Sequence, residues 1–200
     1  MHALVFFAVA AQSLPRELSL SASGRLLQSW VPELQAMRDW SPEHHALQLE
    51  VAAQFTISSN LDVATLPRFG FTVLGVSGTD EATEIGVDLG LEIVFIDGRK
   101  SNSCAAVPWQ CPYQPPHPAP PSARAAGLYP AGPLLGSRTS INVHCYVDAV
   151  YVACIFNNQT AITAMVAPSA RATAPVASFG TLEGVVTSIQ SWRLALPGAH

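Results

Sequence analysis

The chain has 200 residues, of which 49% are hydrophobic and 12% charged, and its formal net charge at pH 7 is -4. This length suits one domain with a sizeable buried core, and the composition excludes wholesale disorder. Because the chain has no basic surplus, nucleic acid is not expected as a partner. Nor is a membrane, since no stretch reaches the roughly 18 apolar residues that a spanning helix needs.

The first segment, residues 1–14, allows two interpretations. Residues 4–11 (LVFFAVAA) form an apolar run containing the A-x-A string Ala8-Val9-Ala10, which resembles a secretory signal peptide and its cleavage site. No Lys or Arg precedes the run, although a signal normally begins with positive charge. The alternative is a buried strand left from a preceding domain. Only the signal-peptide interpretation would imply secretion or a vacuolar location. The sequence does not decide between the two interpretations.

Residues 15–46 are expected to be a linker. A helix is plausible only here, but Pro15, Pro32 and Pro42 interrupt the stretch too often for a long one.

Residues 47–196 are predicted to form the folded domain. Apolar and polar residues alternate over 47–57, which indicates a long, half-buried strand. Clusters of Gly, Ser, Asp and Thr separate further expected strands at 69–76, 84–88, 91–97, 161–166 and 181–196. Many short strands without a long amphipathic helix predict an all-β fold, a two-sheet antiparallel β-sandwich of jelly-roll-like type.

Residues 141–156 are predicted to form a β-hairpin within this domain. A two-residue turn at Asp148-Ala149 would place one set of apolar residues on a single buried face: Val143, Cys145, Val147, Val150, Val152 and Cys154. The two cysteines would then lie diagonally across the pair, and we interpret them as small core residues rather than a disulfide. With Cys104 and Cys111 they form neither a disulfide framework nor a zinc motif.

A proline-rich surface insertion is expected at 108–133, where nine of 26 residues are Pro. Its aromatic residues Trp109, Tyr113 and Tyr129 are candidates for stacking against sugar rings if the domain binds carbohydrate. A ligand for a proline-recognition domain is a second interpretation of this segment.

No string in the sequence indicates a cofactor, a metal site or a catalytic centre. Phosphate-binding glycine loops are absent, and His144 is expected to point outward from a strand rather than act as a base. The acidic residues around the turns are expected to be structural: Asp80, Glu81, Glu84, Asp88 and Asp97. Asn158-Gln159-Thr160 forms an N-glycosylation sequon on an expected turn, at Asn157-Asn158, which would matter only in a secreted chain.

Several strings in chain order resemble the C-terminal β-sandwich of glycoside hydrolase family 32, which contains invertases, inulinases and levanases. They are 69–74 (FGFTVL), 81–88 (EATEIGVD), 95–101 (FIDGRKS), 141–148 (INVHCYVD) with 152–163 (VACIFNNQTAIT), and 191–194 (SWRL). Ahead of them, 8–18 (AVAAQSLPREL) is similar to the segment that closes the family's catalytic propeller, and 31–38 (VPELQAMR) resembles the family's linker. Ala149 and Ala153 depart from the Arg and Glu of the family hairpin. These departures remove charge from the turn and the outer face and keep the apolar positions.

The resemblance implies an accessory domain that packs against a five-bladed catalytic propeller of a β-fructofuranosidase-type enzyme acting on sucrose or fructans. The family's catalytic carboxylates lie in that propeller, so this chain alone is expected to be inactive. Residues 109–112 (WQCP) imitate an acid/base string but carry Gln110, which cannot act as a general acid. The alternatives are a stand-alone carbohydrate-binding sandwich and a fragment without function.

Overall fold

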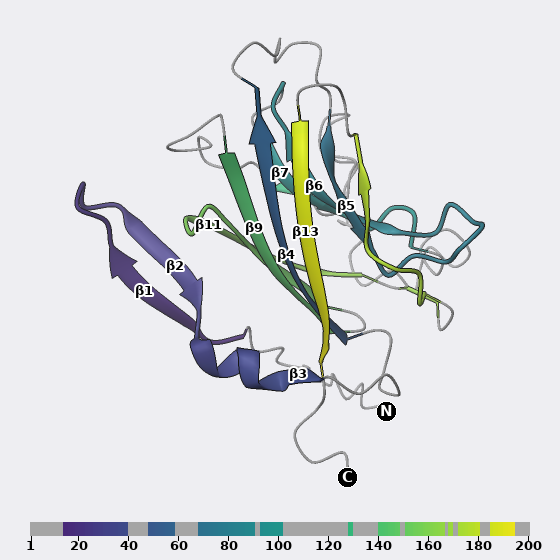
Figure 1. Cartoon of the computed structure of the whole chain (residues 1–200), viewed down its shortest axis with the longest axis horizontal. Helices are drawn as coiled ribbons and strands as arrows, with labels where there is room; N and C mark the ends of the chain where they lie inside the picture. Colours follow the sequence, from purple (N-terminus) through teal and green to yellow (C-terminus); the bar gives the residue numbers. More distant parts are fainter. Residues whose placement is uncertain are drawn as a thin grey trace, which may run out of the picture.

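The computed structural model describes residues 14–39, 48–58, 68–90, 93–101, 128–129, 140–148, 151–166, 168–169, 172–180 and 185–194. Two antiparallel sheets make up most of this part, and a separate two-stranded ribbon lies beside them (Figure 1). The predicted all-β sandwich is therefore confirmed.

The first large sheet has six strands in the order β11-β10-β9-β4-β13-β3. Its members are β3 (Arg38–Asp39), β4 (Gln48–Ile57), β9 (Ser140–Asp148), β10 (Tyr151–Phe156), β11 (Thr160–Met165) and β13 (Val185–Leu194). The second has five strands in the order β12-β5-β6-β7-β8. They are β5 (Phe69–Val73), β6 (Thr83–Asp88), β7 (Ile93–Asp97), β8 (Leu128–Tyr129) and β12 (Ala177–Phe179).

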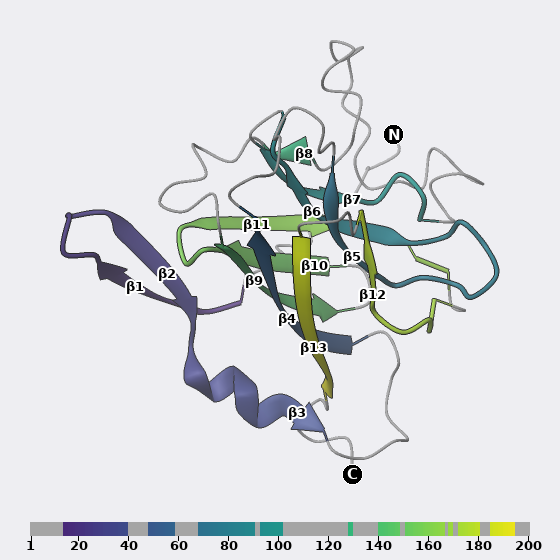
Figure 2. The same cartoon turned by 45° about the horizontal axis from the view of Figure 1, so that its top comes forward.

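The inter-sheet core lies between the two sheets and is built from alternate residues of each strand. In β4 the buried residues Val51, Phe55 and Ile57 all point inward, as the alternation over 47–57 predicts. Phe55 meets Phe69 of the other sheet edge to face, with 5.1 Å between ring centroids. Aromatic and aliphatic contacts of this kind hold the two layers together. Figure 2 shows the two sheets from a second direction.

The β9–β10 hairpin forms as predicted, but its register differs from the expected one by two residues. Asp148 pairs with Tyr151, so residues 149–150 separate the strands instead of Asp148-Ala149. Because a shift of two residues returns every side chain to the same face, the hydrophobic pattern could not distinguish the two registers. In the observed register Cys145 lies directly opposite Cys154, and the two form a disulfide. The interpretation of these cysteines as unpaired core residues was wrong.

Residues 15–46, expected to be a linker, contain regular structure in their described part, 15–39. β1 (Arg16–Leu20) and β2 (Leu26–Trp30) pair with each other as the separate ribbon, and the 3-10 helix η1 (Pro32–Met37) follows. Pro32 occupies the first turn of η1, where a missing N–H is tolerated, so proline starts a short helix here and does not merely break a long one. β3 then joins the edge of the six-stranded sheet.

The proline-rich segment 108–133 is described only at Leu128–Tyr129, which form β8 and pair with β7. This end of the expected insertion is therefore a sheet edge and not a surface loop. The rest of the segment and residues 1–13 lie outside the described residues. No helix in the described part is long and apolar enough to cross a membrane.

Candidate functional site

The outer face of the six-stranded sheet, turned away from the other sheet, carries a second hydrophobic cluster. We call it the outer core, and its buried members are Trp30, Leu34, Tyr146, Ala153, Ile155 and Leu194. The ring of Trp30 meets Tyr146 edge to face at 5.4 Å, and its Nε1 donates a hydrogen bond to the carbonyl oxygen of His144 at 3.0 Å. The outer core therefore fixes the end of the ribbon and the helix η1 against the sandwich.

A buried ion cluster lies beside the outer core, centred on the fully buried carboxylate of Glu50. Arg38 reaches it from β3 with two hydrogen bonds, Nε to Oε2 at 2.6 Å and Nη2 to Oε1 at 2.7 Å. His144 Nε2 lies 2.7 Å from Oε1, and the Arg38 guanidinium stacks on Trp192 at 3.8 Å from the ring centroid. Arg38 thus connects the end of η1 to β4 and β13, and Glu50 extends the cluster to His144 on β9.

The charges in this cluster stabilise one another. Burial alone opposes ionisation of Glu50, but hydrogen bonds from Arg38 and His144 outweigh burial, and the pKa of Glu50 is lowered. The hydrogen bond to Glu50 raises the pKa of Arg38. Burial, with the negative charge of Glu50, raises the pKa of Tyr146. At neutral pH the cluster therefore consists of a charged Arg38–Glu50 pair next to the uncharged phenol of Tyr146. This arrangement suits a structural role better than proton transfer.

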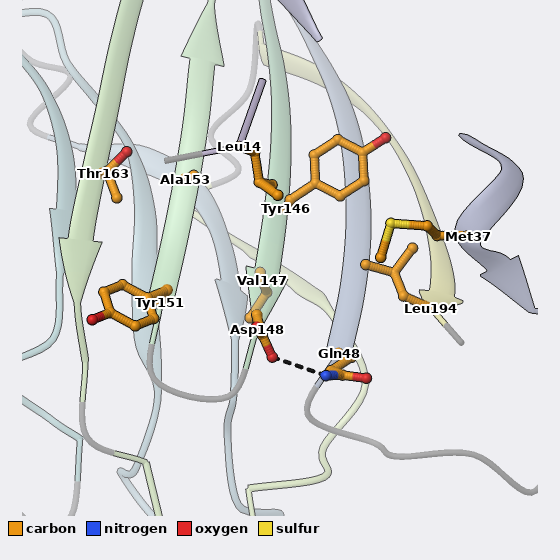
Figure 3. Close-up of a pocket in the computed structure, with 10 residues that line it drawn as sticks. All are labelled: Leu14, Met37, Gln48, Tyr146, Val147, Asp148, Tyr151, Ala153, Thr163 and Leu194. Carbon is orange, nitrogen blue, oxygen red and sulfur yellow. Dashed lines mark hydrogen bonds between the residues drawn. The ribbon is translucent and has the colours of Figure 1, made fainter. Parts of the chain in front are cut away.

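A small cavity of about 130 Å³ adjoins the outer core (Figure 3). Apolar and aromatic side chains make up most of its lining: Leu14, Met37, Tyr146, Tyr151, Ala153 and Leu194. At one end Gln48 Nε2 donates a hydrogen bond to Asp148 Oδ1 at 2.9 Å (Figure 3). With this lining the cavity suits an apolar side chain better than a charged ligand.

The ribbon carries exposed leucines. Leu18, Leu20 and Leu26 are 65%, 71% and 52% exposed, and Leu20 pairs directly with Leu26, so the three share one face. An isolated two-stranded ribbon is marginally stable in water. Here Gln28 ties it to the sandwich, its backbone N–H donating to the carbonyl oxygen of Asn158 at 2.6 Å and its Nε2 to that of Gln159 at 2.8 Å. A grouped apolar surface of this kind is typical of a protein contact.

The acidic residues at the turns make structural contacts. Asp97 binds the side chains of Arg99 and Arg68, and although burial opposes ionisation, the hydrogen bonds from Arg99 lower its pKa. Glu81 accepts hydrogen bonds from the backbone N–H and the hydroxyl of Ser169, at 2.6 and 2.9 Å. In the described part of the chain, these contacts place no two carboxylates as acid and nucleophile across a cleft.

Of the residues proposed for sugar stacking, Trp109 and Tyr113 lie outside the described residues. Tyr129 lies on β8, and nothing is described of its side chain. Their role stays a prediction. His144 points outward from β9, as expected, and binds Glu50. No cluster of potential metal ligands is present among the described residues.

Sequence reasoning missed Glu50 and Arg38. Glu50 occupies a polar position in the alternation over 47–57, so the pattern assigned it to the outer face without showing that another segment covers it. The one available signal was an Arg at the end of the string 31–38, which the resemblance had assigned to a linker.

Comparison with known proteins agrees with this architecture. The family described as "Glycosyl hydrolases family 32 C terminal" matches residues 22–193. Exo-inulinase from Aspergillus awamori is similar with a TM-score of 0.62 and 15% identity, over 92% of this chain and 35% of that one. Fructan 1-exohydrolase IIa from Cichorium intybus is similar with a TM-score of 0.60 and 16% identity, over 91% of this chain and 40% of that one. Sucrose-6-phosphate hydrolase from Lactobacillus gasseri is similar with a TM-score of 0.58 and 12% identity, over 90% of this chain and 33% of that one.

No curated protein matches the chain. The chain spans at most 40% of the length of these three solved structures, and at such low identities they show the fold alone. The family match covers most of the sequence, including η1, the ion cluster and the disulfide-bonded hairpin. The chain belongs to the family of C-terminal domains of glycosyl hydrolases family 32.

Proposed function

We propose that this chain is the accessory β-sandwich of a family 32 glycosidase, in which it docks against a five-bladed catalytic propeller and stabilises it. The parent enzyme would hydrolyse O-glycosyl bonds of sucrose or fructans. The three structural relatives named above are by name an exo-inulinase, a fructan 1-exohydrolase and a sucrose-6-phosphate hydrolase, and the chain spans only a part of each. The chain itself would contribute no catalytic carboxylate.

The observation that carries the proposal is the ribbon β1–β2. It belongs to neither sheet of the sandwich and exposes Leu18, Leu20 and Leu26 on one face. Solvent-exposed leucines in a marginal ribbon are unfavourable unless a partner covers them. Because residues 8–18 resemble the segment that closes the family's propeller, the partner that fits this face is the rest of a propeller blade.

The outer core and the ion cluster support the same role, because they make the ribbon's connection rigid. Trp30 packs on Tyr146 at the end of β2, and Arg38 is bound to Glu50 at the end of η1. A propeller held by the ribbon would therefore have a fixed orientation relative to the sandwich. A flexible linker would not provide this.

The first experiment reads the transcript upstream of Met1 and measures the mass of the native protein with an antibody against the recombinant chain. We expect a native mass well above the 21.2 kDa of this chain, or a bound propeller subunit. The immunocaptured protein should release fructose from sucrose, inulin or levan, whereas the recombinant chain should not. A native protein of 21.2 kDa that captures no propeller would overturn the proposal.

A second experiment tests the docking surface. The upstream propeller would be produced separately, and its inactivation half-life on heating measured with and without this chain. We expect the chain to lengthen the half-life and the triple variant Leu18→Ser/Leu20→Ser/Leu26→Ser to lose the effect. Met165→Ser is the matched control, because Met165 is also exposed, at 48%, but lies on β11 away from the ribbon. If the control and the triple variant behave alike, the ribbon is not the docking surface.

A further inference from the structure

The turn between β10 and β11 presents one asparagine to solvent. Asn157 and Asn158 both have left-handed backbones, with φ of 48° and 56°, a conformation that Asn tolerates better than most residues. The side chain of Asn157 turns back to β9, where its Oδ1 accepts a hydrogen bond from the backbone N–H of Asn142 at 2.8 Å. The described hydrogen bond of Asn158 uses only its carbonyl oxygen, so its exposed amide side chain is free to react.

Asn158 begins Asn158-Gln159-Thr160, the only N-x-S/T sequon in the 200 residues. A glycosylation acceptor must lie on an accessible turn, and this one does. We infer that Asn158 carries an N-linked oligosaccharide in the native protein. This inference does not rest on the proposed function, although Asn158 lies beside the ribbon, where it accepts a hydrogen bond from Gln28.

The disulfide between Cys145 and Cys154 is a second observation, and it points to the compartment where such glycans are added. It joins the same β9–β10 hairpin that leads into the sequon. Disulfides form and persist in oxidising environments, such as the endoplasmic reticulum lumen and the cell exterior. The disulfide therefore supports the inference, because the endoplasmic reticulum lumen is both oxidising and the place where N-linked glycans are added.

The surroundings of Asn158 leave room for an oligosaccharide. Asn158 lies at the rim of an open depression of about 470 Å³ on the outer face of the six-stranded sheet. Small and uncharged polar residues line most of this depression: Ala52, Gln54, Asn142, Ser188 and Gln190. Their amides and hydroxyl can hydrogen-bond to the hydroxyl groups of neutral sugars. The first sugars of the glycan would thus meet several polar side chains on an open surface, beside His144 and Ile155.

The test uses the native protein and the full chain secreted from a eukaryotic host behind a cleavable signal. Treatment with peptide N-glycosidase F should lower the mass of both and leave Asp at position 158 in the peptide map. Asn158→Gln and Thr160→Ala should each abolish the mass shift, whereas Thr160→Ser should retain it, since Ser completes a sequon.

Asn157→Gln is the matched control at the same turn and should keep the glycan. Folding is checked in each variant by non-reducing peptide mapping of the disulfide. An unmodified Asn158 in the native protein would overturn the inference, whatever the host-expressed chain shows. A mass shift that survives Asn158→Gln would also overturn it, because the glycan would then lie elsewhere.

Discussion

The two hydrophobic regions of this molecule are built on different principles. The inter-sheet core takes its residues from alternate positions of long strands, as Phe55 and Val51 show, and it is apolar almost throughout. The outer core exists because residues 30–38 cross the far face of one sheet, and it adjoins the ion cluster of Glu50 and Arg38. The first region can be formed by strand pairing alone. The outer core forms only if residues 30–38 pack at one place on the outer face of the six-stranded sheet.

This difference suggests distinct roles. An apolar core gives stability that is tolerant of small changes in position, because hydrophobic burial has no direction. A buried ion pair with good geometry specifies one arrangement more strongly than it stabilises it. We therefore expect the inter-sheet core to determine whether the domain folds and the ion cluster to determine where the ribbon is held.

The largest effect is expected from Phe55→Ala in the inter-sheet core. Removing a fully buried Phe should lower the free energy of unfolding by about 3–5 kcal/mol, because a cavity replaces the contact with Phe69. Urea denaturation monitored by tryptophan fluorescence would measure it. Phe179→Ala, at a half-buried aromatic residue on β12, is the control and should cost less. Equal losses would show that the inter-sheet core is not the main source of stability.

The next effect is expected from Arg38→Met in the ion cluster. This change leaves the Glu50 carboxylate buried with His144 as its remaining partner, and should cost roughly 3 kcal/mol. Adding Glu50→Met should recover most of the loss, because it removes the uncompensated charge. A double-mutant cycle in urea measures both. If the double variant is as unstable as the single one, the cluster contributes stability rather than position, and the contrast drawn above fails.

A smaller effect is expected from Cys145→Ala/Cys154→Ala. The disulfide closes a loop with a sequence separation of 9, and its loss should cost about 2–3 kcal/mol by relaxing the unfolded chain. Denaturation of the variant and the oxidised protein, with and without reductant, measures this. Reductant should lower the midpoint of the oxidised protein more than that of the variant. An identical midpoint for the variant and the oxidised protein would show that the disulfide adds nothing to stability.

The mildest effect is expected from acidification. The folded pKa of Glu50 lies below its ordinary value of 4.5, and that of Asp97 below 3.8. Their ionisation thus contributes stability that is present above these ordinary values and is lost as the pH falls through the lower folded pKa values. The Tm should be flat near neutral pH and fall progressively below pH 4.5. Glu50→Gln should weaken the dependence of Tm on pH. If Tm depends on pH in the same way in that variant, Glu50 does not contribute to the loss of stability in acid.

The sequence predicted the inter-sheet core well, because the period of two over 47–57 is a local signal for a half-buried strand. The outer core could not be predicted in the same way. Glu50 is buried by residues that approach from β2, η1 and β3, and no local pattern records such an approach. The ribbon escaped prediction because only Trp30, at its end, reaches the outer core, while Leu18, Leu20 and Leu26 on the same face remain exposed.

The observed pairing of Cys145 with Cys154 has a consequence for how the hairpin matures. Since a slip of two residues keeps the same side chains buried, an immature β9–β10 hairpin has two nearly equivalent alignments. Only one of them brings the two sulfur atoms within bonding distance. In the oxidised protein the bond therefore holds the hairpin in the observed register and excludes the slipped one, which the hydrophobic pattern alone does not exclude.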